Sequence, residues 1–195
     1  MDGVIVAQRR DLNAEMHSDP QVALGGRSFV PEVLRAPPRV RLAHFAKEAA
    51  LHCEVQPRAP YFNFQGDGPH SSRELLGLLT FSYGTGVMTV ERIYGSLVED
   101  ILFHSFLGGA KPHPSSVRAF RRLERAALVS SLTRFLEMSF DGLRESSVDQ
   151  AEQSVWLRAL ALPHPPAQVD CLKPDELVQD RINQATWVDR MLMDF

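Results

Sequence analysis

The chain has 195 residues, of which 44% are hydrophobic, a length and composition typical of one globular domain with appendages. No apolar run reaches the ~18 residues that a membrane-spanning helix needs. Arg9 and Arg10 follow the first short apolar run, which is the reverse of a secretory signal. We therefore expect a cytoplasmic protein without a membrane partner. The two cysteines, Cys53 and Cys171, are too few for a disulfide framework.

The formal net charge of −3 does not by itself favour a nucleic-acid partner, but the charges are unevenly distributed. Residues 111–134 carry six basic side chains and one acidic side chain. Residues 135–195 carry five basic and eleven acidic side chains. Because close patches of opposite charge attract each other, we expect the acidic segment to fold back over the basic one.

The N-terminal half of the chain begins without a periodic pattern. Residues 1–38 are punctuated by Gly25-Gly26 and Pro37-Pro38, which predicts an extended, partly ordered arm. Over residues 39–55, apolar side chains recur at three- and four-residue steps, which predicts a helix. Residues 56–70 are rich in proline and glycine and predict a loop.

The strongest local signals begin at Ser71. Ser71 and Glu74 have the spacing of a capping box, in which each side chain binds a free backbone N–H of the other residue. The Leu-rich segment that follows is apolar nearly all round, as in a buried helix. Thr89 is a candidate N-cap for a helix over residues 89–97, and another helix is expected at 98–106.

The longest predicted helix covers about residues 116–140. Ser115 or Ser116 is its expected N-cap, and Asp141-Gly142 is its expected end. Its expected apolar face consists of Val117, Phe120, Leu123, Ala127, Leu128, Leu132 and Phe135.

Two further helices are expected at about 147–162 and 175–193. The predicted fold is therefore all-α, a compact bundle of about six helices with a helix-turn-helix-like core. We divide the chain into the N-terminal arm (1–38), a helical domain (39–140) and an acidic helical extension (141–195).

Four arginines near the start of the long helix are spaced by three and four residues, so a continuous helix would place them on one face. Guanidinium groups bind phosphate oxygens and guanine edges through paired hydrogen bonds, and free N–H groups at a helix start attract anions. The candidate DNA-contact residues are Lys111, Ser115, Ser116, Arg118, Arg121, Arg122 and Arg125. The competing interpretation is a solvated arginine face without a ligand, and the residues alone leave both open.

Patterns that would indicate catalysis are absent from the sequence. It contains no Gly-rich phosphate loop, no Gly-x-Ser-x-Gly and no His-Glu-x-x-His. His44, His52 and Cys53 lie close together, but the sequence nearby offers no fourth zinc ligand. We expect no catalytic residue, metal, cofactor or small-molecule substrate.

Five short segments between residues 71 and 136 follow an order found in one protein family. They are Phe81-Ser-Tyr-Gly-Thr-Gly86, Thr89 with Ile93, Glu99-Asp100 with Phe103, Gly108-Gly109, and Pro112 through Phe120-Arg121-Arg122. In order and spacing they resemble the N-terminal domain of bacterial insertion-sequence transposases of the DDE class. The resemblance implies a DNA-binding, helix-turn-helix domain of a mobile element that acts in transposition.

The chain also departs from that family. Glu91 and Arg92 stand where the family usually has basic residues, and His113-Pro114 replaces its Asp-His. Residues 141–195 are too short for the family's ribonuclease-H-like catalytic domain and lack its strand pattern. The resemblance thus implies a truncated or repurposed transposase fragment that binds DNA without cutting it, with a second copy of the chain as a further candidate partner. The alternative is a helical protein–protein interaction or regulatory module, which would show no salt-dependent DNA binding.

Overall fold

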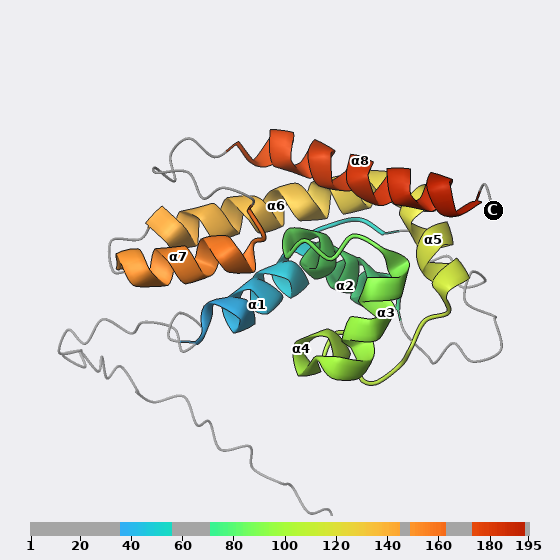
Figure 1. Ribbon diagram of the computed structural model, residues 1–195, viewed down its shortest axis with the longest axis horizontal. Coiled ribbons are helices and arrows are strands. Elements are labelled where there is room, and N and C mark those ends of the chain that lie inside the picture. Colours follow the sequence, from blue (N-terminus) through green and yellow to red (C-terminus); the bar gives the residue numbers. More distant parts are fainter. Residues whose placement is uncertain (1–35, 56–70, 145–148, 163–172, 194–195) are drawn as a thin grey trace, which may run out of the picture. The chain divides into compact units, whose positions relative to one another are not determined.

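The computed structural model describes residues 36–55, 71–144, 149–162 and 173–193. Within these ranges every regular element is a helix, which confirms the all-α prediction (Figure 1). The helices are α1 (Pro38–Leu51), α2 (Ser72–Gly84), α3 (Val90–Glu99), α4 (Ile101–His104), α5 (Pro114–Leu123), α6 (Arg125–Arg144), α7 (Gln150–Ala159) and α8 (Pro174–Met193). The extended arm expected at the N-terminus lies almost wholly outside the described residues.

The helix starts follow the capping signals of the sequence. The Ser71 hydroxyl accepts a hydrogen bond from the Glu74 N–H at 3.2 Å, and the Glu74 carboxylate accepts one from the Ser71 N–H at 2.7 Å. This is the predicted capping box of α2. The Thr89 hydroxyl likewise accepts from the Arg92 N–H at 3.2 Å and begins α3. Both predicted caps are therefore confirmed.

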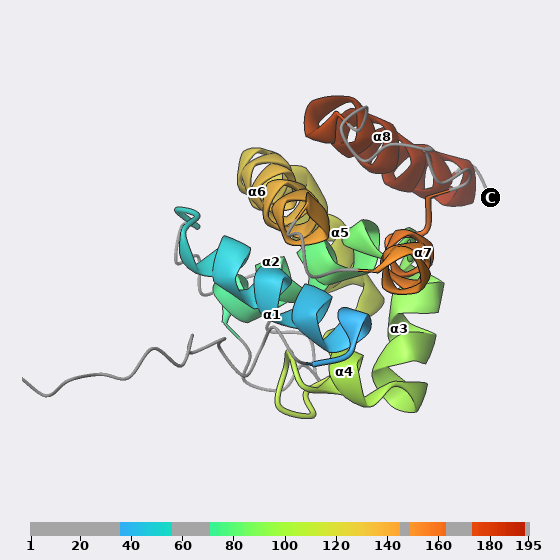
Figure 2. The ribbon, with the colours of Figure 1, turned by 90° about the vertical axis from the view of Figure 1, so that its left-hand side faces the viewer.

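Helix α2 forms the centre of the core. Its side chains from Leu75 to Tyr83 are all buried, because α1 and α6 pack against it and against each other (Figures 1 and 2). Gly84 allows the closest approach of α6, since a Cβ at this position would lie 2.2 Å from the Phe135 ring. The continuous apolar surface of α2 is thus explained by contacts on more than one side.

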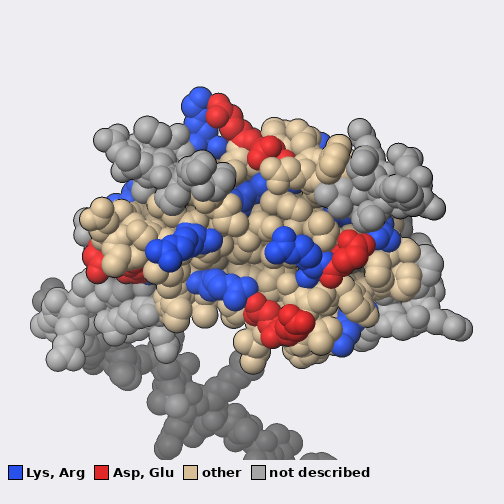
Figure 3. All heavy atoms as spheres, viewed as in Figure 1, with Lys and Arg blue, Asp and Glu red and all other residues tan. Residues whose placement is uncertain are grey.

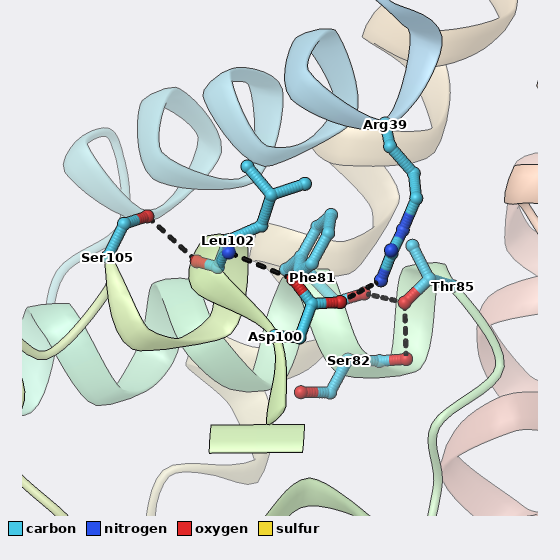
Figure 4. Close-up of polar contacts among 7 residues, drawn as sticks. All are labelled: Arg39, Phe81, Ser82, Thr85, Asp100, Leu102 and Ser105. Atoms are coloured by element: carbon cyan, nitrogen blue, oxygen red, sulfur yellow. Dashed lines mark hydrogen bonds and ion pairs between the residues drawn. The ribbon is translucent and has the colours of Figure 1, made fainter. Parts of the chain in front are cut away.

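An ion pair joins α1 to the corner between α3 and α4. Arg39 of α1 contacts the carboxylate of Asp100 at 2.5 Å, and the other Asp100 oxygen accepts from the Leu102 N–H at 2.9 Å (Figure 4). Asp100 therefore ends α3 and caps α4. The helix expected at 98–106 is shorter than predicted, and Ile101 at its start is 83% exposed.

The long helix expected at 116–140 is two helices. Glu124 leaves helical geometry, with φ −107° and ψ 30°, and separates α5 from α6. Phe120 of α5 and Ala127 of α6 both face the core, while Leu123 beside the break is 50% exposed. The prediction that Leu123 belongs to the apolar face is therefore wrong.

Both ends of the predicted long helix also differ in the structure. His113 is the N-cap of α5, and its side chain accepts from the Ser115 N–H. Pro114 occupies the first turn, where a missing N–H costs no hydrogen bond. Helix α6 continues through Asp141 and Gly142 to Arg144. Gly142 does not end the helix. A Cβ there would lie 3.4 Å from the Trp156 ring, so the glycine permits the close approach of α7.

Helices α7 and α8 share the core with the preceding helices. Trp156 of α7 and Val178 and Ile182 of α8 are buried in the same cluster as α1, α2 and α6. All the described helices lie in one unit, Pro31–Phe195. The domain boundary expected at residue 140 falls inside α6 and stays a prediction.

A buried arginine on α8 binds the C-terminal ends of two other helices. Arg181 donates to the carbonyl oxygen of Tyr83 at 2.7 Å, to that of Gly84, and to that of Leu160 at the end of α7. Helix C-termini carry partial negative charge and unpaired carbonyls, so a cation is favoured there. Burial lowers the pKa of Arg181 to about 10, against the opposing effect of Asp180, so the guanidinium stays charged at neutral pH.

Replacing Arg181 with methionine should lower the free energy of unfolding by at least about 1–3 kcal/mol, the cost of one buried carbonyl left without a donor. Arg181→Lys should lie between this variant and the parent, because an ammonium keeps the charge but not the geometry of the guanidinium. Urea unfolding followed by circular dichroism measures both effects. The exposed Arg158 on α7 provides the control, and Arg158→Met should change the stability by less than about 0.5 kcal/mol. A methionine variant at position 181 as stable as the parent would contradict this role.

Candidate nucleic-acid interface

The predicted DNA-contact residues lie on or next to α5. This helix packs against α3 on one side and α6 on another. Its apolar residues Val117 and Phe120 are buried and fix which way the helix faces. The remaining side chains are therefore divided between an inner face, toward the core, and an outer face.

Two of the predicted contact residues lie on the inner face. Ser116 is fully buried, and Arg121 is only 8% exposed. Arg121 donates to the hydroxyl of Tyr83 at 2.7 Å and to the carbonyl of Met88 at 3.1 Å. It holds α5 against the end of α2 and the segment after it. Their burial keeps these two residues away from a DNA ligand, so the predicted interface was wrong to include them.

Four of the predicted residues lie on the outer face or just before it. Ser115 and Arg118 are half-buried, while Arg122 and Lys111 are exposed. Arg118 forms an ion pair with Glu91 of α3 at 2.7 Å. The outer face of α5, defined here by Ser115, Arg118 and Arg122 with the small Ala119 between them, follows the three- and four-residue spacing of one helix face.

Arg125 points to a different partner. It is the first residue of α6, beyond the break at Glu124, and its guanidinium donates to the hydroxyl of Thr186 on α8 at 3.3 Å. The four arginines expected on one face are thus divided among the core, the outer face of α5 and the junction with α8. Figure 3 shows basic and acidic side chains interleaved on the face it displays, without one uniform basic surface.

The junction of α5, α6 and α8 is hollow. One cavity of about 190 Å³ has at its walls Tyr83, Arg121, Arg122, Arg125, Leu128, Ile182, Ala185 and Thr186. A second, of about 350 Å³, is lined by Arg125, Asn183, Thr186 and Trp187. Arg125 and Thr186 line both cavities, so the two cavities adjoin, and we call them together the α8 groove.

The α8 groove contains residues that the sequence analysis did not single out. Asn183, Thr186 and Trp187 lie on α8, far from the basic segment in sequence. One signal was available. Val178, Ile182 and Ala185 form the buried stripe of α8, and Trp187 is a large aromatic residue outside that stripe, with 62% of its surface exposed. An aromatic residue off the apolar period of a helix is a candidate for ligand contact.

Features that would support other functions are limited within the described ranges. No group of three or more His, Cys, Asp or Glu side chains is placed to hold a metal ion there. Cys53 is a buried free thiol whose sulfur donates to the carbonyl of Ala49 at 3.4 Å. None of the helices described has both the length and the apolar character needed to cross a bilayer.

Comparisons of the chain with protein-family models, curated proteins and solved structures find no match in any of the three. The resemblance to transposase N-terminal domains therefore rests on the order and spacing of this chain's own residues.

The two adjacent arginines of α5 should differ sharply in their effect on stability. Arg121→Ala should lower the free energy of unfolding by about 1–3 kcal/mol, because it removes the donor to the buried Tyr83 hydroxyl and to the part-buried Met88 carbonyl. Arg122→Ala removes the same side chain from an exposed position and should change stability by less than about 0.5 kcal/mol. Thermal or urea unfolding of the two variants provides the comparison. Equal losses would show that Arg121 is not a structural residue.

Proposed function

We propose that this chain is a non-catalytic DNA-binding domain derived from a DDE transposase, and that it contacts DNA through the outer face of α5. The observation that carries this proposal is the pairing of Arg118 and Arg122 four residues apart on one exposed helix face, with Lys111 just before the helix. A face of this kind suits the phosphate backbone or a major groove, where helices enter with their polar side chains. The cytoplasm is the corresponding location.

The side chains between the two arginines also suit a DNA surface. Ala119 lies between Arg118 and Arg122 and adds little bulk, so the helix backbone could approach the phosphates closely. The Ser115 hydroxyl at the start of the same face is a hydrogen-bond donor for a phosphate oxygen. Phosphate contacts of this type give affinity and register, whereas sequence would be read by contacts to base edges.

Glu91 is an acidic side chain that contacts this face. Its ion pair with Arg118 is partly exposed, with the arginine side chain 29% and the glutamate side chain 56% accessible. Exposed pairs of this kind contribute only about 0–1 kcal/mol. A DNA phosphate, which accepts two hydrogen bonds from one guanidinium, could therefore replace Glu91. In the absence of DNA, the pair would hold the Arg118 side chain in place.

A second candidate function is supported by a different surface. Tyr94 and Val98 are four residues apart and exposed on α3, and Ile101 is exposed at the start of α4. Adjacent exposed apolar residues are typical of protein–protein contacts. Under this alternative, the chain is a helical interaction or regulatory module, and the stripe would receive another protein or a second copy of the chain.

Affinity for duplex DNA should fall steeply with salt if Lys111, Arg118 and Arg122 contact phosphates. Three such contacts give a slope of log affinity against log salt near about −2.7, from about −0.9 per contact. Arg122→Ala should weaken binding and make the slope shallower by about 0.9, the value for one phosphate contact. Fluorescence anisotropy with a labelled duplex, between roughly 50 and 200 mM salt, measures both changes. Arg158→Ala on α7 removes an equal charge elsewhere and should leave the slope unchanged. A folded Lys111, Arg118, Arg122 triple alanine variant that binds like the parent would exclude this interface and favour the interaction module.

Glu91→Gln should tighten duplex binding by about 0.2–1 kcal/mol, the usual value of an exposed ion pair, because Arg118 no longer has to leave a charged partner. Glu99→Gln is the matched control, since it also removes one exposed negative charge from α3. The same anisotropy titration compares the three proteins. If both glutamine variants bind equally, only the overall charge matters and Arg118 does not exchange Glu91 for a phosphate.

A further inference from the structure

We propose that the α8 groove binds an unpaired segment of DNA, with one base stacked on Trp187 and a neighbouring phosphate at Arg125 and Arg122. This inference rests on the proposed DNA-binding function but concerns a separate surface. The outer face of α5 would contact duplex DNA, whereas the α8 groove would take single-stranded DNA.

The position of Trp187 suggests a stacking role. Trp187 is 62% exposed even though it lies two residues from the buried Ala185. It forms part of the wall of the larger cavity, whose volume of about 350 Å³ falls within the range of roughly 300–1,000 Å³ typical of small-ligand sites. An exposed aromatic ring beside such a hollow provides a flat surface on which a nucleobase can stack.

A cation lines the same cavity as Trp187. Arg125 donates to the hydroxyl of Thr186, the residue before Trp187, at 3.3 Å. The same hydroxyl donates to the carbonyl of Ile182 at 2.7 Å, which leaves an oxygen lone pair oriented to accept from Arg125. The guanidinium is therefore linked to α8 at the residue that precedes Trp187. A stacked base and its own phosphate need this arrangement of an aromatic ring and an adjacent cation.

The charge of the α8 groove favours an anionic ligand. The described residues that line it include three arginines, Arg121, Arg122 and Arg125, and no acidic side chain. Arg121 is already bonded to Tyr83, so Arg122 and Arg125 are the two available for a phosphate. Arg122 also belongs to the outer face of α5, so the groove and that face adjoin along one helix.

The exposed aromatic ring and the two arginines together favour single-stranded DNA over an acidic peptide or a duplex. In a duplex the base faces are covered by their neighbours, so stacking on Trp187 requires an unpaired base. An acidic peptide would use the arginines but would have no reason to cover the indole. Asn183, next to the indole in the same cavity, offers both a donor and an acceptor for a base edge.

The fluorescence of the protein gives a direct test. The chain has two tryptophans, and Trp156 is fully buried, so a single-stranded thymidine oligonucleotide should quench the emission of Trp187. Trp187→Ala should weaken oligonucleotide binding, measured by anisotropy with a labelled strand, by at least about five-fold, the lower limit of about 1 kcal/mol for one stacked base. Trp187→Phe should lose most of the quenching while keeping most of the affinity, because phenylalanine still stacks.

Two controls separate the groove from the proposed duplex interface. Trp187→Ala should bind blunt duplex DNA like the parent. Arg118→Ala should weaken duplex binding but leave binding of the thymidine strand unchanged.

Three outcomes would contradict the proposals. Unchanged strand binding by a folded Trp187→Ala variant, with normal duplex binding, would overturn only the proposal for the α8 groove. If the parent protein binds neither duplex nor single-stranded DNA, the proposed function itself is overturned. Equal quenching by an oligoglutamate peptide that displaces the strand would assign the groove to acidic peptides and overturn this inference.

Discussion

The insertion of Arg181 between the ends of α2 and α7 determines where α8 lies. Its guanidinium satisfies three carbonyl oxygens from two helices, at a place where those helices carry partial negative charge. An apolar side chain could fill the space but could not bind the carbonyls. Because α8 supplies one wall of the groove, the positions of Thr186 and Trp187 relative to Arg125 depend on this buried cation.

Local structure could be predicted from the sequence where it depends on neighbouring residues. The capping box at Ser71, the cap at Thr89 and the buried faces of α1 and α2 all involve groups within a few residues of one another. The break at Glu124 could not be predicted in this way. It contains no proline or glycine and reflects the different directions in which α5 and α6 pack.

The candidate interface shows the same limit. Spacing by three and four residues indicates a shared face only within one continuous helix. It does not tell whether that face points outward. Arg121 is buried because the hydroxyl of Tyr83, 38 residues earlier in the chain, is there to accept its hydrogen bond. Arg122, the next residue, lies on the exposed outer face of α5. A count of basic residues in 111–134 therefore overstates the charge available to DNA, and the aromatic residue of the groove comes from a helix that contributes little basic charge.

The long sequence separation between α2 and Arg181 also has a consequence for synthesis on the ribosome. Tyr83 and Arg181 are 98 residues apart, and chains are made from the N-terminus at about 5–20 residues per second. For several seconds the end of α2 exists without the cation that binds it, and the apolar surface that Ile182 covers is open to water. A nascent chain that stops before α8 would stay in this open state, which is the kind of surface that chaperones and proteases recognise.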